Sequence, residues 1–257
     1  MFYTFSSRKN WIVWTTGSLA LFSLLAFTEK RLRQHQCKAI LVEINQPEGQ
    51  QFLNRKDVTA FLTNNGEEPL IGQPIDAIDL SKLEQRLGQF ALIKKAHVSF
   101  DLAGNLLANI TEPDPIARLV RGGSGARVVG GQYITREGRF IPLSMNYSAR
   151  VPVVSGSWFR SHRTLKSPTG QELLTLFRYI NETPLWRAQI AEIAVDSVGE
   201  VTLWPQVGTY KIEFGVPQNI ETKFDKVKLF YTQIAPQKGW SRYHRVNVQY
   251  RNQLVCE

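Results

Sequence analysis

An uncharged run of seventeen residues near the start of the chain, Trp11–Phe27, is the feature that most constrains how the chain can fold. As an α-helix rising ~1.5 Å per residue, it would extend roughly 25 Å, close to the hydrocarbon thickness of a bilayer. Arg8 and Lys9 precede the run, and Glu29 and Lys30 follow it. The run therefore predicts a transmembrane anchor. The residues expected to form it are Trp11, Trp14, Leu19, Leu21, Phe22, Leu24, Leu25 and Phe27.

A cleaved signal peptide and a buried core helix are the two alternatives to an anchor. A signal peptide fits the basic start and the apolar run, but Thr28-Glu29-Lys30-Arg31 offers no small-x-small cleavage site. A core helix is at odds with charges packed at both ends of the run. Orientation stays open, because the flanking Lys and Arg residues slightly favour a cytoplasmic C-terminal side, whereas long domains often translocate regardless of charge.

The charge of the remaining chain is unevenly distributed. Residues 39–115 carry six Lys/Arg and eleven Asp/Glu, whereas residues 116–257 carry nineteen and ten. This difference predicts two domains with these bounds, preceded by a tail at 1–10 and a polar stalk at 28–38 that could continue the anchor helix. The basic second domain is compatible with nucleic acid, an anionic surface or an acidic protein partner, and equally with a generally solvated face.

The two cysteines, Cys37 and Cys256, do not settle the compartment in which the chain works. No CxxC pattern is present, and nothing near Cys37 resembles a lipoprotein cleavage site. A disulfide between the two would tie the last predicted strand to the stalk. Two free or buried thiols are the favoured alternative.

Apolar periodicity predicts a strand, two helices and a hairpin in the first domain. In chain order, the expected elements are 39–45, 55–65, about 76–90, 96–102 and 106–110. Asn54 is the expected N-cap of the first helix and Asp76 or Asp79 that of the second, and Gly104 lies in the turn of the hairpin. A three-stranded sheet with two helices on one face is the packing that this order favours.

The second domain is predicted to be rich in strands. Its glycine-rich segment, 122–131, is expected to be a flexible hairpin and not a phosphate-binding loop, because no Gly-Lys-Ser/Thr follows it. A helix is predicted from Ser167, with Pro168 at its first position, to about Asn181, and another over about 219–234. The other expected strands are 190–196, 201–204, 210–214 and 243–256.

The order strand-helix-helix-strand-strand resembles the POTRA module, and one such module directly after one transmembrane helix resembles the FtsQ/DivIB family of bacterial cell-division proteins. The residues that carry the resemblance in the first domain are Ile44-Asn45-Gln46-Pro47, Gly49, Phe52, Ile78-Asp79-Leu80, Leu83-Glu84, Ile93-Lys94-Lys95-Ala96 and Pro115-Ile116-Ala117-Arg118. The family often has Arg-x-Pro where this chain has Glu112-Pro113-Asp114-Pro115, so no role is carried over for that arginine.

The second domain is similar to the β domain of the same family. Its matching segments are Tyr133–Pro142, Ser144–Gly156, Gly199–Pro205 and Ile212–Gly215. Arg150-Val151-Pro152 is the most specific short match, and Thr135 stands where the family usually has Asp, so the hydrogen bond credited to that carboxylate is expected to be missing. The resemblance implies an α+β fold with a single N-terminal transmembrane helix, a POTRA domain, and an antiparallel β domain with two helices.

The sequence predicts neither an enzyme nor a cofactor. His35, His97, His162 and His244 are scattered, without partners at metal-ligand spacing. A membrane-anchored cell-envelope enzyme would need a catalytic set, and a POTRA-type outer-membrane assembly factor would need a further membrane-embedded region. RNP, KH and helix-turn-helix patterns are also lacking, which makes nucleic-acid binding a weak explanation of the basic second domain.

Binding to a protein partner is the function that remains. The predicted last strand is expected near a sheet edge, where unpaired backbone groups can take a strand from another chain. The resemblance implies the same site, because the last strands of the family's β domain bind the membrane-proximal segment of FtsB, which is paired with FtsL. The expected partner-binding residues are Tyr243, Arg245, Val246, Asn247, Val248, Gln249, Tyr250 and Arg251.

Within that strand, Val246, Val248 and Tyr250 are expected on one face, and the polar and basic residues on the other face suit an acidic partner. Tyr250 matches the family's tyrosine, and a purely packing role is the alternative for it. The resemblance further implies a protein of the inner membrane at the division septum, with its N-terminus in the cytoplasm and both domains in the periplasm. Its implied role is a scaffold that links early to late division assembly.

Overall fold

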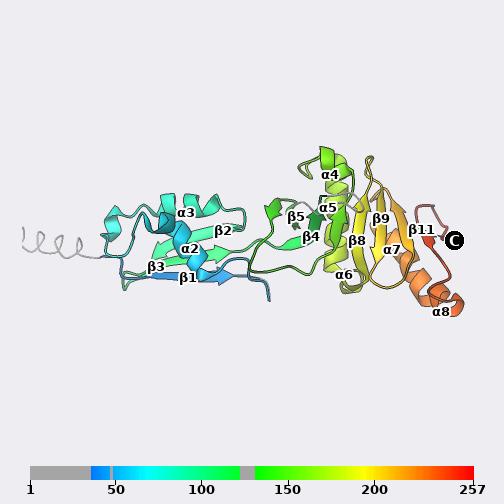
Figure 1. Cartoon of the computed structure of the whole chain (residues 1–257), viewed down its shortest axis with the longest axis horizontal. Helices are drawn as coiled ribbons and strands as arrows, with labels where there is room; N and C mark the ends of the chain where they lie inside the picture. The colour runs from blue at the N-terminus through cyan, green and yellow to red at the C-terminus, as the bar shows by residue number, and fades with distance from the viewer. Residues whose placement is uncertain (1–35, 47–48, 122–130) are drawn as a thin grey trace, which may run out of the picture. The chain divides into compact units, whose positions relative to one another are not determined.

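A computed structural model describes residues 36–46, 49–121 and 131–257 of the chain (Figure 1). The predicted anchor, most of the predicted stalk and nearly all of the glycine-rich segment lie outside these residues. Within the described ranges, no helix has both the length and the apolar character needed to cross a bilayer. The chain divides into two compact units, the first reaching to Thr111 and the second beginning at Glu112, with Gln46–Leu53 belonging to the second unit.

The first unit is built around a three-stranded sheet. Its elements are β1 (Ile40–Asn45), α2 (Arg55–Leu62), η1 (Asn64–Gly66), η2 (Ile75–Ala77), α3 (Leu80–Gly88), β2 (Lys95–Phe100) and β3 (Leu106–Thr111). The central β3 pairs in parallel with β1 and antiparallel with β2. The predicted order of strand, two helices and hairpin is confirmed, and a short 3-10 turn, η2, replaces the first part of the predicted second helix.

The two helices of this unit begin where the sequence predicts. The side chain of Asn54 accepts a hydrogen bond from the backbone of Asp57 at 2.9 Å, and Asp57 reciprocates toward the backbone of Asn54, which forms a capping box. Asp79 caps α3 by accepting from the N–H of Lys82 at 3.1 Å. The apolar face of α3 buries Leu83 and Leu87. Asp79, and not Asp76, is therefore the cap of the second helix.

The last residues of the predicted stalk fold with the first unit. Cys37 is buried, its N–H donates to the carbonyl of Gln73 at 2.9 Å, and its own carbonyl accepts from Gly72 at 2.8 Å. The N–H of Lys38 donates to the carbonyl of Gly104 at 3.0 Å. At Cys37 and Lys38, therefore, the prediction that the stalk continues the anchor helix is wrong, because these backbone groups pair with two loops of the first unit.

The second unit is built around a nine-stranded sheet of order β12-β11-β10-β9-β8-β7-β4-β5-β6. Its elements are β4 (Pro115–Val120), β5 (Gly131–Thr135), β6 (Phe140–Pro142), β7 (Val153–Ser155), α4 (Trp158–Ser161), α5 (Pro168–Glu182), α6 (Pro184–Gln189), β8 (Ile190–Val195), β9 (Val201–Pro205), β10 (Lys211–Gly215), α7 (Ile220–Leu229), the π-helical turn η3 (Phe230–Ile234), α8 (Ala235–Lys238), β11 (Arg245–Asn247) and β12 (Val255–Cys256). The antiparallel pairing of β8, β9 and β10 confirms the meander that the sequence predicts.

The sheet of the second unit is mixed, so the prediction of an antiparallel domain is wrong. β4 pairs in parallel with β7, β7 with β8, and β10 with β11. α5 and α6 lie between β7 and β8 in the chain, and α7, η3 and α8 lie between β10 and β11. Such helical crossovers return the chain to the same end of the sheet, which makes the next strand parallel. The unit also contains three short helices that were not predicted, α4, α6 and α8. Helices this short leave too few turns for an apolar periodicity to be recognised in the sequence.

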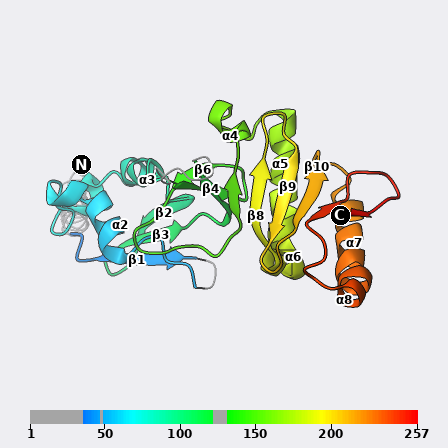
Figure 2. The same ribbon diagram turned by 45° about the vertical axis from the view of Figure 1, so that its right-hand side comes forward.

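The core of the second unit lies between one face of the sheet and its long helices (Figure 2). α5 begins where predicted, with Ser167 accepting from the N–H of Gly170 at 3.2 Å and Pro168 in the first turn. Phe224 of α7 contacts both Trp186 and Phe214, with ring centroids 4.6 and 5.2 Å apart. The residues that alternate with the core positions of β8, β9 and β10 are left on the opposite face of the sheet.

The linker after β1 and the segment after β3 both belong to the second unit. Glu112 is buried, and its carboxylate accepts hydrogen bonds from the N–H groups of Phe52 and Leu53 at 3.2 and 2.8 Å. The ring of Phe52 lies 5.6 Å from that of Tyr133. Burial raises the pKa of Glu112, and the two backbone donors oppose that shift. The predicted boundary at residue 115 therefore differs from the structure, in which Glu112 already binds the second unit's own linker segment.

Candidate functional site

The predicted last strand, 243–256, is two strands joined by a loop. β11 pairs in parallel with β10 and antiparallel with β12, so one long strand over these residues is a wrong prediction. The chain reverses through Asn252, which has a φ of 62°, a left-handed conformation that Asn adopts more readily than most residues. The loop is fastened to α7 by Lys226, whose ammonium group donates to the carbonyl oxygens of Val248, at 3.1 Å, and Tyr250.

The hairpin of β11 and β12 distributes the predicted binding residues over three environments. Val246, Asn247 and Val248 are buried. Tyr243 is half-buried with its ring 5.8 Å from that of Phe230, and Arg245 is half-buried beside carboxylates. Gln249, Tyr250 and Arg251 are exposed, Tyr250 at 55%. The structure thus gathers three of the eight predicted residues at one exposed loop, and it leaves Tyr250 available to solvent.

Two of the residues expected to face an acidic partner already have partners inside the chain. Arg245 forms an ion pair with Glu257 at 2.8 Å, and this carboxylate raises the pKa of the Arg245 guanidinium. The side-chain amide of Asn247 donates to Glu213 at 2.9 Å and accepts from the N–H of Gln249 at 2.9 Å. The predicted outward orientation of Asn247 is therefore wrong, because its amide is used to close the turn after β11.

β12 is an edge of the nine-stranded sheet. Glu257, just after β12, exchanges both backbone hydrogen bonds with Arg245, at 3.0 and 2.9 Å. Since backbone groups alternate along a strand, the N–H and C=O of Cys256 point to the open side of β12. No further strand pairs with that side in the part of the chain that the structure describes. Cys256 is a free thiol, as is Cys37, and burial raises the pKa of both thiols.

A basic cavity of about 430 Å³ lies between α7 and the loop after β11. It is lined by Asn219, Thr222, Lys223, Lys226, Gln249, Arg251 and Asn252, without a carboxylate. Lys223 is itself buried, and its ammonium donates to the carbonyls of Phe214 and Val216 at 2.9 and 2.6 Å. Burial lowers the pKa of Lys223, and the charge of Lys226 acts in the same direction. Positive charge therefore lies beside the exposed loop.

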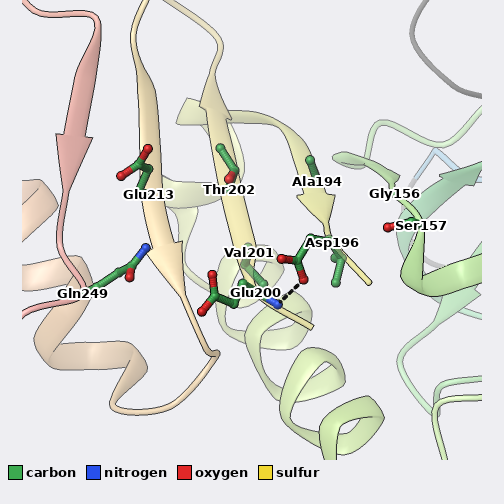
Figure 3. A pocket seen from close by; sticks show the side chains of 10 residues that line it. Gly156, Ser157, Ala194, Asp196, Glu200, Val201, Thr202, Glu213 and Gln249 are labelled. Carbon is green, nitrogen blue, oxygen red and sulfur yellow. Dashed lines mark hydrogen bonds between the residues drawn. The ribbon is translucent and has the colours of Figure 1, made fainter. Parts of the chain in front are cut away.

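The face of the sheet opposite the core carries a shallow polar depression of about 450 Å³ (Figure 3). Thr202 and Glu213 project into it from β9 and β10, and Gln249 reaches it from the loop after β11. The carboxylate of Asp196, at its rim, accepts three backbone hydrogen bonds of 2.9 Å within the turn before β9. These carboxylates serve the turn and the sheet, and no group that could hold a metal ion occurs among the described residues.

The positions that depart from the expected family pattern have structural partners here. The hydroxyl of Thr135 accepts from the N–H of Arg139 at 3.2 Å. This hydroxyl closes the turn between β5 and β6, and the expectation about the family's carboxylate stays a prediction. Asp114 forms an ion pair with Arg136 at 2.8 Å. Both side chains stabilise the start of the second unit's sheet.

Sequence reasoning missed two features that shape the site. The sequence predicts Lys226 only as part of a basic helix, and its hydrogen bond to Val248, 22 residues away, has no local signal. Asn252 lies inside the predicted strand, although Arg251-Asn252-Gln253 is a polar run between Tyr250 and Leu254 that could indicate a turn. The burial of Val246 and Val248 on the predicted face is confirmed.

Comparison with known protein families agrees with this architecture. A family model named FtsQ/DivIB, C-terminal related, matches residues 114–257, and a model named POTRA-like domain matches residues 35–111. A search of curated proteins finds no match. The first model covers more than half of the chain and coincides with the nine-stranded unit, while the second coincides with the three-stranded unit. The chain belongs to the FtsQ/DivIB family of bacterial cell-division proteins.

Proposed function

We propose that this chain is a non-enzymatic scaffold of cell division that binds FtsB/FtsL-type single-pass proteins along the open edge of β12. Membership of the FtsQ/DivIB family supports a role in division. The observation that carries the proposal is the position of β12 at the sheet edge, directly beside a loop with an exposed Tyr250. A strand added to such an edge gains affinity from backbone hydrogen bonds and selectivity from nearby side chains.

In the proposed complex, the partner strand pairs with the outward N–H and C=O of Cys256. Tyr250 supplies apolar contact area beside the strand. Covering an aromatic ring costs little side-chain conformational entropy, because the side chain has few rotatable bonds. Arg251 and the cavity around Lys226 lie on the same side of α7 and favour an acidic residue next to the pairing segment. The edge thus gives the partner its orientation, and the basic cavity distinguishes acidic partners from others.

The proposed location is the inner membrane at the division septum, with the N-terminus in the cytoplasm and both domains in the periplasm. Trp11–Phe27 supplies the anchor in this arrangement. An anchor confines the binding edge to the layer in which single-pass partners also lie, which raises their effective concentration without any additional contact. Recruitment of such partners is how the chain would link early to late division assembly.

Affinity capture of the FtsB/FtsL-type pair from the same organism by the full chain tests the binding proposal. Tyr250→Ala and Arg251→Glu are expected to weaken capture by roughly tenfold each, a loss typical of a rim aromatic and a charge reversal. Val207→Ala, at an exposed turn, and Lys238→Glu, at the end of α8, are matched controls that should capture normally. Equal capture by all four variants would remove the loop from the interface.

A reporter fused after Glu257 tests the proposed topology separately. An enzyme that is active only in the periplasm should be active in this fusion, and one that is active only in the cytoplasm should not. The reverse result would contradict the proposed orientation while leaving the edge-binding proposal to the capture experiment.

A further inference from the structure

Two parallel strands of the second unit end side by side. β4 and β7 pair in parallel, with Arg118 opposite Val153 and Leu119 opposite Val154. Their carboxyl ends therefore lie at the same end of the sheet. Arg121 is the first residue after β4, and Gly156 is the first residue after β7. In open sheets with helical crossovers, ligands bind outside the carboxyl ends of parallel strands, because the loops there diverge and leave a crevice.

A cavity of about 370 Å³ opens at this place. It is lined by Arg121, Gly156, Phe159, Arg160 and Arg163, three guanidinium groups and no carboxylate. None of these three arginines forms a side-chain hydrogen bond or an ion pair with another residue in the described ranges. In contrast, Arg136 and Arg245 of the same unit each lie against two carboxylates. The cavity thus concentrates positive charge that the fold itself leaves unbalanced.

The backbone around the cavity is held in place. The imidazole of His162 stacks on the buried Trp158 with ring centroids 4.1 Å apart, and its Nδ1 lies 2.9 Å from the carbonyl of Trp158. Leu165 is buried after the segment, so the short stretch with Arg160 and Arg163 is fixed at both ends. A Cβ atom at Gly156 would lie 1.9 Å from the carbonyl oxygen of Val195, so the chain approaches β8 more closely there than any side chain permits.

One buried nitrogen beside the cavity has no hydrogen-bond acceptor. The Nε of Arg121 is inaccessible to solvent and has no hydrogen-bond partner. The Nε atoms of Arg118 and Arg245 are also buried without an acceptor, so the Nε of Arg121 gains its meaning from the two further arginines that line the same cavity. A carboxylate has two oxygens, enough for one guanidinium fork, whereas a free phosphate or a phosphate monoester offers three or more and can bridge several arginines. The number of arginines therefore favours phosphate over an acidic side chain.

We propose that the cavity at the carboxyl ends of β4 and β7 binds a phosphate group, held by Arg121, Arg160 and Arg163. Arg121 supplies the inner fork, because its Nε is buried, and the exposed Arg160 and Arg163 close on the anion from α4 and the segment after it. The site is separate from the β12 edge and does not depend on the partner proposed for that edge. A soluble phosphate monoester and the monoester headgroup of phosphatidic acid share the chemistry that the site would recognise, whereas a phosphodiester headgroup has only two charged oxygens.

Equilibrium dialysis of the full chain against radiolabelled inorganic phosphate, at constant ionic strength, tests this site. One saturable site per chain is expected. Arg121→Lys keeps the charge but loses the fork, and it should weaken binding by roughly tenfold; Arg160→Gln with Arg163→Gln should weaken it by more than that. Lys238→Gln with Arg242→Gln removes the same charge from exposed positions outside the cavity and should leave binding unchanged.

The absence of saturable binding by the unaltered chain would overturn the proposal, and so would equal losses in the two double variants. Tryptophan fluorescence checks that each variant is folded, because the buried Trp158 and Trp186 report on this unit. Two competitors distinguish the sources of the phosphate. Displacement by glycerol phosphate but not by vesicles that contain phosphatidic acid supports a soluble monoester, and displacement by those vesicles supports the lipid headgroup.

Discussion

The ammonium group of Lys226 donates a hydrogen bond to the carbonyl oxygen of Val248 at 3.1 Å, and to that of Tyr250 as well. These bonds join the middle of α7 to the loop between the last two strands. The loop has few other attachments, because Gln249, Tyr250 and Arg251 are all exposed. Lys226 therefore sets the position of Tyr250 relative to the edge of β12, and it is a positioning residue of the proposed interface.

Lys226→Met keeps the alkyl chain and removes both hydrogen bonds. The loop should lose its attachment to α7, so amide hydrogen exchange at 249–253 is expected to accelerate by roughly tenfold, and partner capture should weaken by a similar factor. Lys228→Met, on the same helix but exposed, is the matched control for both measurements. Normal exchange and capture in Lys226→Met would show that the loop holds its conformation without the lysine.

Alanine substitutions at Gly156 and Gly239 distinguish the cost of steric overlap from the cost of backbone strain. Both have positive φ, 126° and 93°, but a Cβ would lie 1.9 Å from the carbonyl oxygen of Val195 at Gly156 and meets nothing within 4 Å at Gly239. Gly156→Ala is expected to lower the free energy of unfolding by roughly 3 kcal/mol or more, and Gly239→Ala by only about 1 kcal/mol. Denaturant unfolding followed by tryptophan fluorescence measures both. Equal losses would contradict the close approach of the chain to β8.

Glu112 should give the second unit a pH-dependent stability. Because burial raises the pKa of Glu112 above the value of the unfolded chain, about 4.3, the folded chain binds more protons between the two values. Its contribution is then fully present below about pH 4 and is lost as the pH rises through the folded pKa. Glu112→Gln cannot ionise, so the stability of the unaltered chain relative to this variant should fall as the pH rises.

Denaturant unfolding of the second unit, followed by tryptophan fluorescence from about pH 4 upward, measures this pH dependence. Glu200→Gln, at an exposed turn, is the control and should follow the unaltered chain at every pH. A stability difference between the unaltered chain and Glu112→Gln that grows with pH would mean that the two backbone donors, Phe52 and Leu53, outweigh burial at this carboxylate.

The elements that could be predicted are those whose signals are local. The Asn54 and Ser167 caps, the Gly104 turn and the alternation of β8 to β10 each lie within a few residues of the structure that they form. The mixed sheet was missed because the pairing of β4 with β7 joins residues more than thirty positions apart, and the sequence carries no mark of strand direction. Periodicity fixes the faces of strands but not their neighbours.

The candidate site was predicted only in part for the same reason. Val246 and Val248 alternate into the core as their pattern indicates. Asn247 alternates outward in the pattern, yet its amide bonds to Glu213 across the sheet, which depends on the parallel pairing with β10. The sheet edge is β12, and not the single last strand that the sequence predicts. The chain reverses at Asn252, so that β12 pairs on the outer side of β11.

The central claim is that a partner strand pairs with the outward backbone of β12, and one substitution tests it most directly. Cys256→Pro removes the outward N–H, suits extended backbone, and leaves the hydrogen bonds of Glu257 to β11 in place. Cys256→Val keeps the N–H and has a side chain of similar size. Binding of the FtsB/FtsL-type pair to the full chain should weaken by roughly tenfold or more in Cys256→Pro and stay normal in Cys256→Val. Unchanged affinity in folded Cys256→Pro would contradict strand addition at this edge.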